Sequence, residues 1–257
     1  MNDYLQIGFS QRIQLDWLEL TAALSIEGRT PGEIQDALQE LLREQLSVGG
    51  TAERGNREKA ITILLKTWVS VSKGLAPLRD DGLRRLERLP AVDHMAVHWG
   101  MSMAAYPFFG LVAQTVGRLL ALQGTAGAAQ VQRRVREQLG ERETVARAAR
   151  RVLRTYIDWG VLTETAEKGV YQAAPKRLVE DRELAAWLIE AALVSSGSTS
   201  APLKTIVQAA ALFPFTIEQP SGLQLESNIR LDVFRQGLDQ DMVMLASDEW
   251  RVTSGEL

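Results

Sequence analysis

The chain has 257 residues, of which 46% are hydrophobic and 24% are charged, so it is long enough to bury a core and has the composition of an ordinary globular protein. It contains no cysteine, which excludes disulfides, thiol nucleophiles and cysteine-ligated zinc sites. The N-terminus lacks the basic-then-apolar order of a signal peptide, and the lack of cysteine fits a reducing compartment, so we expect a cytoplasmic protein. The formal net charge is −3.

Helical periodicity dominates residues 1–108, which we expect to form an N-terminal helical domain. Residues 12–25 carry apolar side chains at helical spacing. A second helix is predicted after Thr30, which fits the N-cap position, with Pro31 at the first helical position and Glu33 three residues after the cap. A loop over 47–56 and a further helix over 57–73 follow.

Residues 95–117 are apolar enough and long enough to raise the question of a membrane span. The segment contains Pro107 near its middle, and Arg118 follows it directly. We therefore interpret it as two buried helices, the first ending near Pro107 and the second restarting after Gly110, and we expect no membrane contact.

Two histidines, His94 and His98, lie one helical turn apart, which is the spacing of a zinc-binding helix. The glutamate of an HExxH motif is missing and the chain has no third histidine, so we expect both to be structural and predict no metal and no cofactor. Phosphate-binding loops, dinucleotide glycine signatures and nucleophile elbows are also missing from the sequence. We expect no enzymatic activity, while an activity built only on Asp and Glu stays an open alternative.

Two amphipathic helices are predicted in the central third of the chain, joined by a short GERE turn. The first, within 125–140, turns Val131, Val135 and Leu139 inward. The second, over 143–158, carries its apolar stripe through Val145, Val152 and Tyr156.

Arginines lie largely opposite these apolar stripes. From 131 to 154 there are eight arginines against three glutamates, a local balance of +5, and the rest of the chain therefore carries −8. A concentrated basic patch on an acidic protein is expected for a polyanionic partner. A solvated helix face is the alternative interpretation.

A hairpin is predicted after Trp159, with strands in VLTETA and VYQAA around an EKG turn. Over about residues 110–175, this pattern of helix, turn, helix and hairpin resembles the winged helix-turn-helix family. The resemblance implies that the 143–158 helix is a recognition helix, that the hairpin is a wing, and that Trp159 packs the wing onto the helix. It also implies that double-stranded DNA is the partner.

The candidate DNA-contacting residues fall into three groups. The recognition helix offers four arginines for the major groove, the preceding helix and turn offer others for phosphates, and the wing tip offers one lysine. The full set is Arg147, Arg150, Arg151 and Arg154; Arg133, Arg134, Arg136 and Arg142; and Lys168.

The predicted fold is mainly α, with a helical N-terminal domain (1–108), a central winged helix-turn-helix (109–178) and a small α+β C-terminal part (179–257). In the last part we expect helices over 182–196 and 203–213, a loop over 195–202, and several strands after residue 215.

The function predicted from these patterns is DNA binding by a cytoplasmic protein of prokaryotic type, which acts as a regulator or as the DNA-contacting subunit of a larger complex. The alternative is a non-enzymatic scaffold or adaptor whose winged helix docks a protein. The N-terminal helices or the acidic C-terminus would then supply further contacts to that protein, and a homodimer is also left open.

Overall fold

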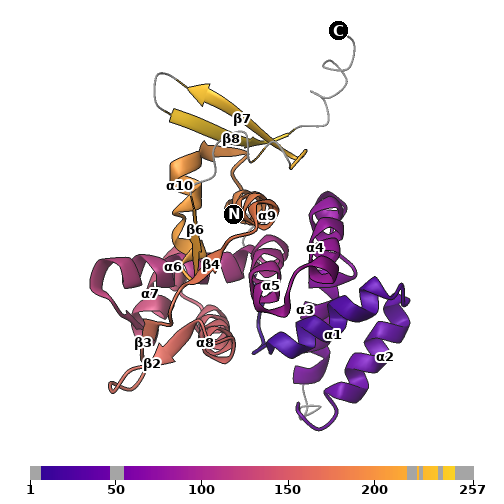
Figure 1. Cartoon of the computed structure of the whole chain (residues 1–257). Coiled ribbons are helices and arrows are strands. Elements are labelled where there is room, and N and C mark those ends of the chain that lie inside the picture. The colour runs from indigo at the N-terminus through magenta and orange to yellow at the C-terminus, as the bar shows by residue number, and fades with distance from the viewer. Residues whose placement is uncertain (1–6, 47–54, 219–224, 226–227, 237–239, 247–257) are drawn as a thin grey trace.

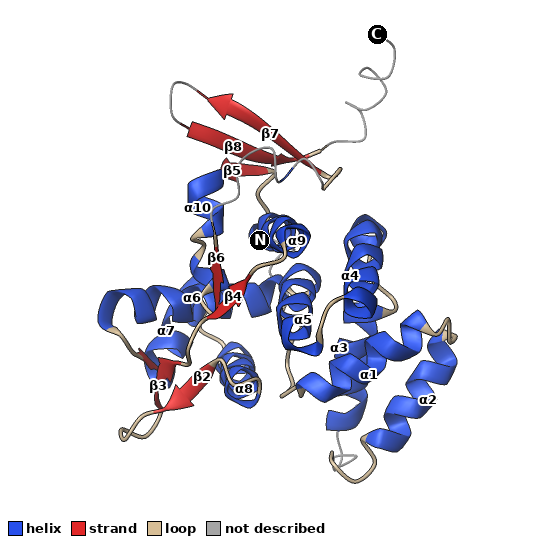
Figure 2. Ribbon diagram, viewed as in Figure 1, coloured by secondary structure: helices blue, strands red, loops and turns tan. Residues whose placement is uncertain are grey.

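A computed structural model describes residues 7–46, 55–218, 225, 228–236 and 240–246. The fold is mainly α with small sheets, as the sequence predicts. The strands form three small sheets: one beside α8, one near α6, and one that contains the last strands of the chain (Figure 2).

The N-terminal part is a helical layer, seen at the right of Figure 1. Its elements are α1 (Leu15–Ile26), α2 (Pro31–Leu41), α3 (Asn56–Trp68), the short 3-10 helix η2 (Lys73–Leu75) and α4 (Ala76–Arg88). The predicted capping box starts α2: the Thr30 hydroxyl accepts a hydrogen bond from the Glu33 backbone N–H, and the Glu33 carboxylate accepts one from the Thr30 N–H at 2.8 Å. Most of the predicted 47–56 loop lies outside the described residues.

Two central helices, α5 (Ala91–Ala105) and α6 (Pro107–Gln123), are bent by 115° at their junction. The predicted break near Pro107 is confirmed, but α6 restarts at Pro107 itself and not after Gly110. Proline suits the first helical position because its missing N–H would have no partner there. Among the described residues no single helix is long and apolar enough to cross a membrane; this bent pair alone would qualify, by length and composition.

A compact unit of three helices and three short strands follows, at the lower left of Figure 1. Its elements are α6, β1 (Ala126–Gly127), α7 (Ala128–Leu139), α8 (Glu143–Asp158), β2 (Leu162–Glu164) and β3 (Val170–Ala173). The sheet is antiparallel in the order β1-β3-β2, and Thr163 pairs with Gln172 across the hairpin. The two predicted helices and the predicted hairpin are therefore present.

The C-terminal part combines helices with two small sheets. Its elements are β4 (Arg177–Val179), α9 (Arg182–Ser196), β5 (Ser200–Pro202), α10 (Leu203–Val207), the 3-10 helix η3 (Ala210–Leu212), β6 (Phe215–Ile217), β7 (Leu231–Gln236) and β8 (Gln240–Leu245). Strands β4 and β6 pair in parallel, and β5, β8 and β7 form an antiparallel sheet.

Two expectations for this part are wrong in detail. The helix predicted over 203–213 ends at Val207 and continues only as η3, and the loop predicted over 195–202 contains β5. One of the strands expected after residue 215, in GLQLES (222–227), falls almost wholly outside the described residues.

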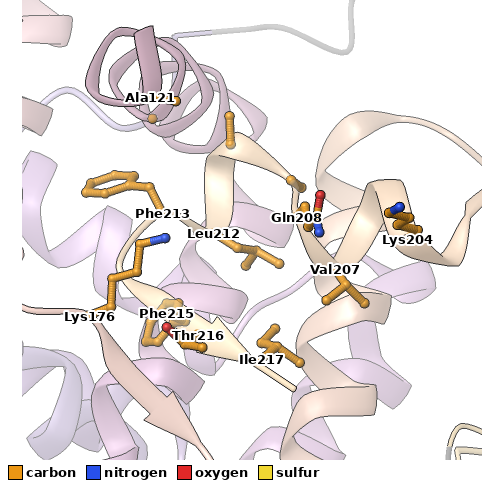
Figure 3. Close-up of a pocket in the computed structure, with 13 residues that line it drawn as sticks. Ala121, Lys176, Lys204, Val207, Gln208, Leu212, Phe213, Phe215, Thr216 and Ile217 are labelled. Carbon is orange, nitrogen blue, oxygen red and sulfur yellow. The ribbon is translucent and has the colours of Figure 1, made fainter. Parts of the chain in front are cut away.

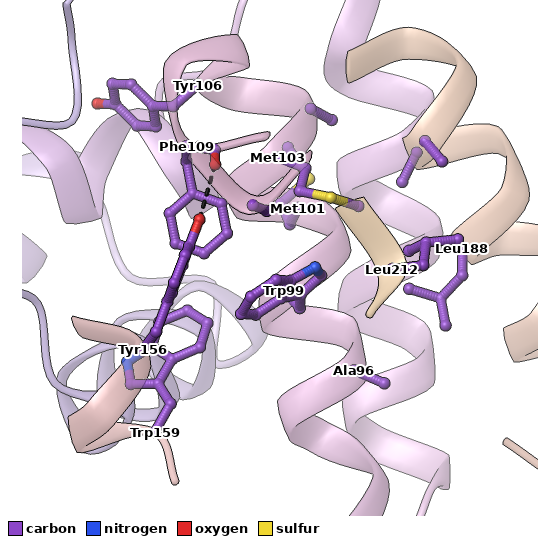
Figure 4. Packing of buried hydrophobic residues seen from close by; sticks show 14 of the residues in the cluster. Ala96, Trp99, Met101, Met103, Tyr106, Phe109, Tyr156, Trp159, Leu188 and Leu212 are labelled. Atoms are coloured by element: carbon purple, nitrogen blue, oxygen red, sulfur yellow. Dashed lines mark hydrogen bonds between the residues drawn. The ribbon is translucent and has the colours of Figure 1, made fainter. Parts of the chain in front are cut away.

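Aromatic side chains from several elements meet in the centre of the molecule (Figure 4). Trp99 of α5 packs against Phe109, Tyr156 and Trp159, and the Tyr156 hydroxyl donates a hydrogen bond to the Phe109 carbonyl at 2.7 Å. The family resemblance implies that Trp159 packs the wing onto the helix. The structure places its ring in this central cluster, which ties α8 to α5 and α6.

Candidate nucleic-acid interface

One side of α8 packs entirely into the hydrophobic core. Val145, Val152 and Tyr156 are completely buried, as the helical spacing predicts. Because this stripe is fixed against α6 and α7, the opposite side of the helix has a defined direction, away from the core.

Three arginines lie along that opposite side. Arg147, Arg150 and Arg154 are all exposed. Arg150 donates a hydrogen bond to the neutral amide of Gln132 at 3.4 Å, and Arg154 pairs with Glu164 of β2 at 2.9 Å. Arg147 has no ion pair among the described residues, so the guanidinium groups of Arg147 and Arg150 keep an uncompensated charge.

The fourth arginine of the helix, Arg151, does not reach freely outward as expected. It is half-buried and donates a hydrogen bond to the Ser10 carbonyl. Burial, and then the like charge of Arg147, lower the pKa of Arg151. The reason is a long-range contact: the N-terminal segment 7–14 covers that flank of α8.

The arginines of α7 and the turn do not form one surface. Arg133 pairs with Glu137 along the exposed side of α7, and Arg136 pairs with Glu141. Arg134 lies on the flank that faces α6, where it lines a small hollow together with Arg118. Arg118 is thus a second basic residue at this place; the sequence interpretation used it only as the charge that ends the apolar 95–117 segment and did not include it among the DNA-contacting candidates.

The start of α8 is also basic. Arg142 is the residue before the first turn of α8; it is exposed, and it donates a hydrogen bond to the Leu139 carbonyl at 3.2 Å. It forms no ion pair within the described part of the chain. Its position extends the uncompensated charge of Arg147 and Arg150 toward the N-terminal end of the helix.

The hairpin places Lys168 at its tip. The turn closes through the Val170 N–H and the Glu167 carbonyl at 3.1 Å, and Gly169 has a φ of 80°, a left-handed conformation that glycine adopts without strain. Lys168 is exposed and, within the described residues, forms no ion pair, so its ammonium group is free to meet an anion.

The histidine pair belongs to a separate polar cluster, in which His98 is buried and His94 and Glu19 are half-buried. The Trp68 indole N–H donates to Nδ1 of His98 at 3.1 Å, and Nε2 of His98 lies 3.3 Å from a carboxylate oxygen of Glu19. His94 contacts the same carboxylate through Nδ1 at 3.1 Å, while its Nε2 lies 3.0 Å from the Leu89 carbonyl oxygen.

This hydrogen-bond pattern argues against a metal ligand at His98. Because Nδ1 of His98 accepts the indole N–H, the proton of the neutral ring lies on Nε2, the atom that a metal on the Glu19 side would need. Within the described residues no group of three or more His, Cys, Asp and Glu side chains is arranged to hold a metal ion.

A cavity of about 450 Å³ lies between α6 and the C-terminal elements (Figure 3). Its walls include Phe213, Phe215 and Ile217, and Lys176 and Lys204 supply its charges. Both lysines are exposed, and none of the lining residues belongs to α7, α8 or the hairpin. Among the described lining residues no nucleophile is paired with a base.

Comparison of the chain with protein-family models, with curated proteins and with solved structures gave no match. The assignment of function therefore depends on the geometry of the charged side chains.

Proposed function

We propose that this protein binds double-stranded DNA through the exposed side of α8, with the β2–β3 hairpin as a wing. The observation that carries the proposal is the separation of the two sides of α8. Its core stripe is completely buried, and Arg147, Arg150 and Arg154 are exposed on the opposite side.

The order of the elements supports the same proposal. Two helices joined by a short turn and followed by a hairpin are what the resemblance to winged helix-turn-helix domains leads us to expect. The structure adds the short strand β1, which pairs with β3 and extends the hairpin to a three-stranded sheet. In such an arrangement the second helix of the helix-turn-helix enters the major groove. An α-helix fits that groove by width, and the planar guanidinium group suits both phosphate oxygens and guanine edges.

The roles of the basic residues follow from their surroundings. Arg147 and Arg150 are the best placed for the groove because neither forms an ion pair with a carboxylate of the described residues. Arg142 and Lys168, at the start of α8 and at the wing tip, are suited to the flanking phosphates. Arg154 is already paired with Glu164 and would have to exchange that partner for DNA.

The test compares two double variants in a DNA-binding titration by fluorescence anisotropy at several salt concentrations. Arg147→Ala with Arg150→Ala removes two exposed charges from α8. Arg29→Ala with Arg43→Ala removes two exposed charges that are ion-paired in the N-terminal layer, and serves as the control.

We expect only the α8 variant to weaken binding. Each lost phosphate contact lowers the slope of log affinity against log salt by about 0.9. A lost base contact costs about 1–3 kcal/mol and relaxes the sequence preference at one position. If the α8 variant binds as the parent does at every salt concentration, the DNA proposal fails, and docking of a protein partner becomes the better explanation of this unit.

A further inference from the structure

The N-terminal segment 7–14 lies along one flank of α8, although about 140 residues separate the two in the chain. The Ile13 N–H donates to the Thr155 hydroxyl at 3.1 Å, and the Trp159 indole N–H donates to the Ile13 carbonyl at 3.0 Å. Arg151 adds its bond to the Ser10 carbonyl. The segment is therefore joined to α8 at three points, over the last turns of the helix.

A fourth contact neutralises a negative charge on the exposed side of α8. Arg12 forms a two-pronged ion pair with Asp158, in which its Nε and one terminal nitrogen each reach a different carboxylate oxygen. Asp158 follows Arg147 by eleven positions, which places it only about 20° further around the helix, on the same side. Its side chain is 17% exposed, whereas that of Arg12 is 55% exposed.

Without Arg12, the last turns of α8 would be unfavourable for a polyanion. Arg154 is compensated by Glu164, so the carboxylate of Asp158 would be the uncompensated charge there. A phosphate backbone passing this end of the helix would meet a negative group.

We propose that the DNA-binding surface is a composite of α8 and the N-terminal segment, in which Arg12 is a positioning residue that neutralises Asp158. This inference rests on the proposed function. It predicts that Arg12 acts through Asp158 and not through a phosphate of its own.

The test uses Arg12→Ala, Asp158→Asn and the double variant in the same anisotropy titration, with Arg29→Ala as the matched control for loss of an exposed, ion-paired arginine. We expect Arg12→Ala to weaken binding about three- to tenfold at low salt, as one uncovered charge near the surface would, and less at high salt. Asp158→Asn leaves Arg12 unpaired and should strengthen binding. The double variant has the same net charge as the parent at positions 12 and 158. Its affinity for DNA should therefore lie within about twofold of that of the parent.

Other outcomes overturn the inference in different ways. If Arg12→Ala binds as the parent does, Arg12 has no part in the surface. If the double variant stays as weak as Arg12→Ala, Arg12 contacts phosphate directly. If Asp158→Asn also weakens binding, the ion pair serves only to hold the helix in place. A parent protein that does not bind DNA, or that binds equally well without Arg147 and Arg150, instead refutes the proposed function itself.

Discussion

The imidazole of His98 is fully buried, with Trp68 on one side and Glu19 on the other. Burial lowers the pKa of His98 because it disfavours the charged ring, and this effect outweighs the opposing influence of Glu19. For Glu19, burial alone would raise the pKa, but the contacts with His98 and His94 outweigh it and lower the pKa.

A pH dependence of stability follows from His98. In the unfolded chain the pKa of His98 returns to about 6.5. At pH values between 6.5 and the lower pKa of the folded state, the unfolded chain therefore binds more protons than the folded protein. The free energy of unfolding should therefore fall as the pH is lowered below about 6.5, and level off below the folded pKa. Urea denaturation between pH 5 and 8 measures this change in the free energy of unfolding. The pKa of Glu19 is 4.5 in the unfolded chain and lower in the folded protein, so both values lie below this pH range.

His98→Gln is the matching variant, because it keeps a donor toward Glu19 and cannot titrate. The stability of this variant should be nearly flat over the same pH range. An equal slope in the parent and in His98→Gln would mean that other groups cause the dependence.

At the scale of elements, the two sides of α8 can be compared by introducing the same residue, aspartate, on each of them. Val152→Asp puts a carboxylate into the core, where burying an unpaired charge costs several kcal/mol, so the variant should lose its cooperative thermal transition. Arg147→Asp puts the same carboxylate on the exposed side. It should keep the transition within a few degrees and bind DNA more weakly than Arg147→Ala. Thermal denaturation followed by circular dichroism measures the first effect and anisotropy the second.

A folded Val152→Asp protein would show that the helix is rotated relative to the described packing. An unfolded Arg147→Asp protein would show that this side of α8 is buried in some contact. Either result removes the basis for the DNA-binding surface.

Local patterns in the sequence predicted α8, the hairpin and the start of α2 well. The stripe of Val145, Val152 and Tyr156 and the capping box of Thr30 and Glu33 each depend on residues within a few turns of one another. Such spacings report a local conformation directly, which is why these elements and the exposed arginines were predictable.

Contacts between distant segments were not predictable in the same way. Two such contacts join residues more than 140 positions apart: the hydrogen bond from Arg151 to the Ser10 carbonyl and the ion pair of Arg12 with Asp158. Helical periodicity identifies a side of a helix as polar, but it does not say which segment crosses it. The early end of α10 at Val207 has the same origin, because an apolar stretch has the same pattern whether it packs as one helix or as two short pieces.

At the scale of the whole molecule, a buried ionic network fastens the C-terminal strands to the helices. Glu190 of α9 is 4% exposed, and it accepts hydrogen bonds from the Nε of Arg230 at 2.6 Å and from the Asn228 amide at 2.7 Å. Arg230 also donates to Asp81 of α4 at 3.0 Å. One arginine thus connects α4, α9 and the start of β7.

Removing that arginine should be costly, because the buried carboxylate of Glu190 loses its main partner. We expect Arg230→Ala to lower the free energy of unfolding by about 3–5 kcal/mol in urea denaturation. Adding Glu190→Gln should recover part of the loss, since a neutral amide is less costly to bury than an unpaired charge. Arg235→Ala is the control: its ion pair with Asp241 is exposed and should contribute less than about 1 kcal/mol. If Arg230→Ala costs no more than Arg235→Ala, the strand does not dock on α4 and α9 through this network. If it costs more but Glu190→Gln recovers nothing, the loss comes from packing of the Arg230 side chain and not from the charge left behind.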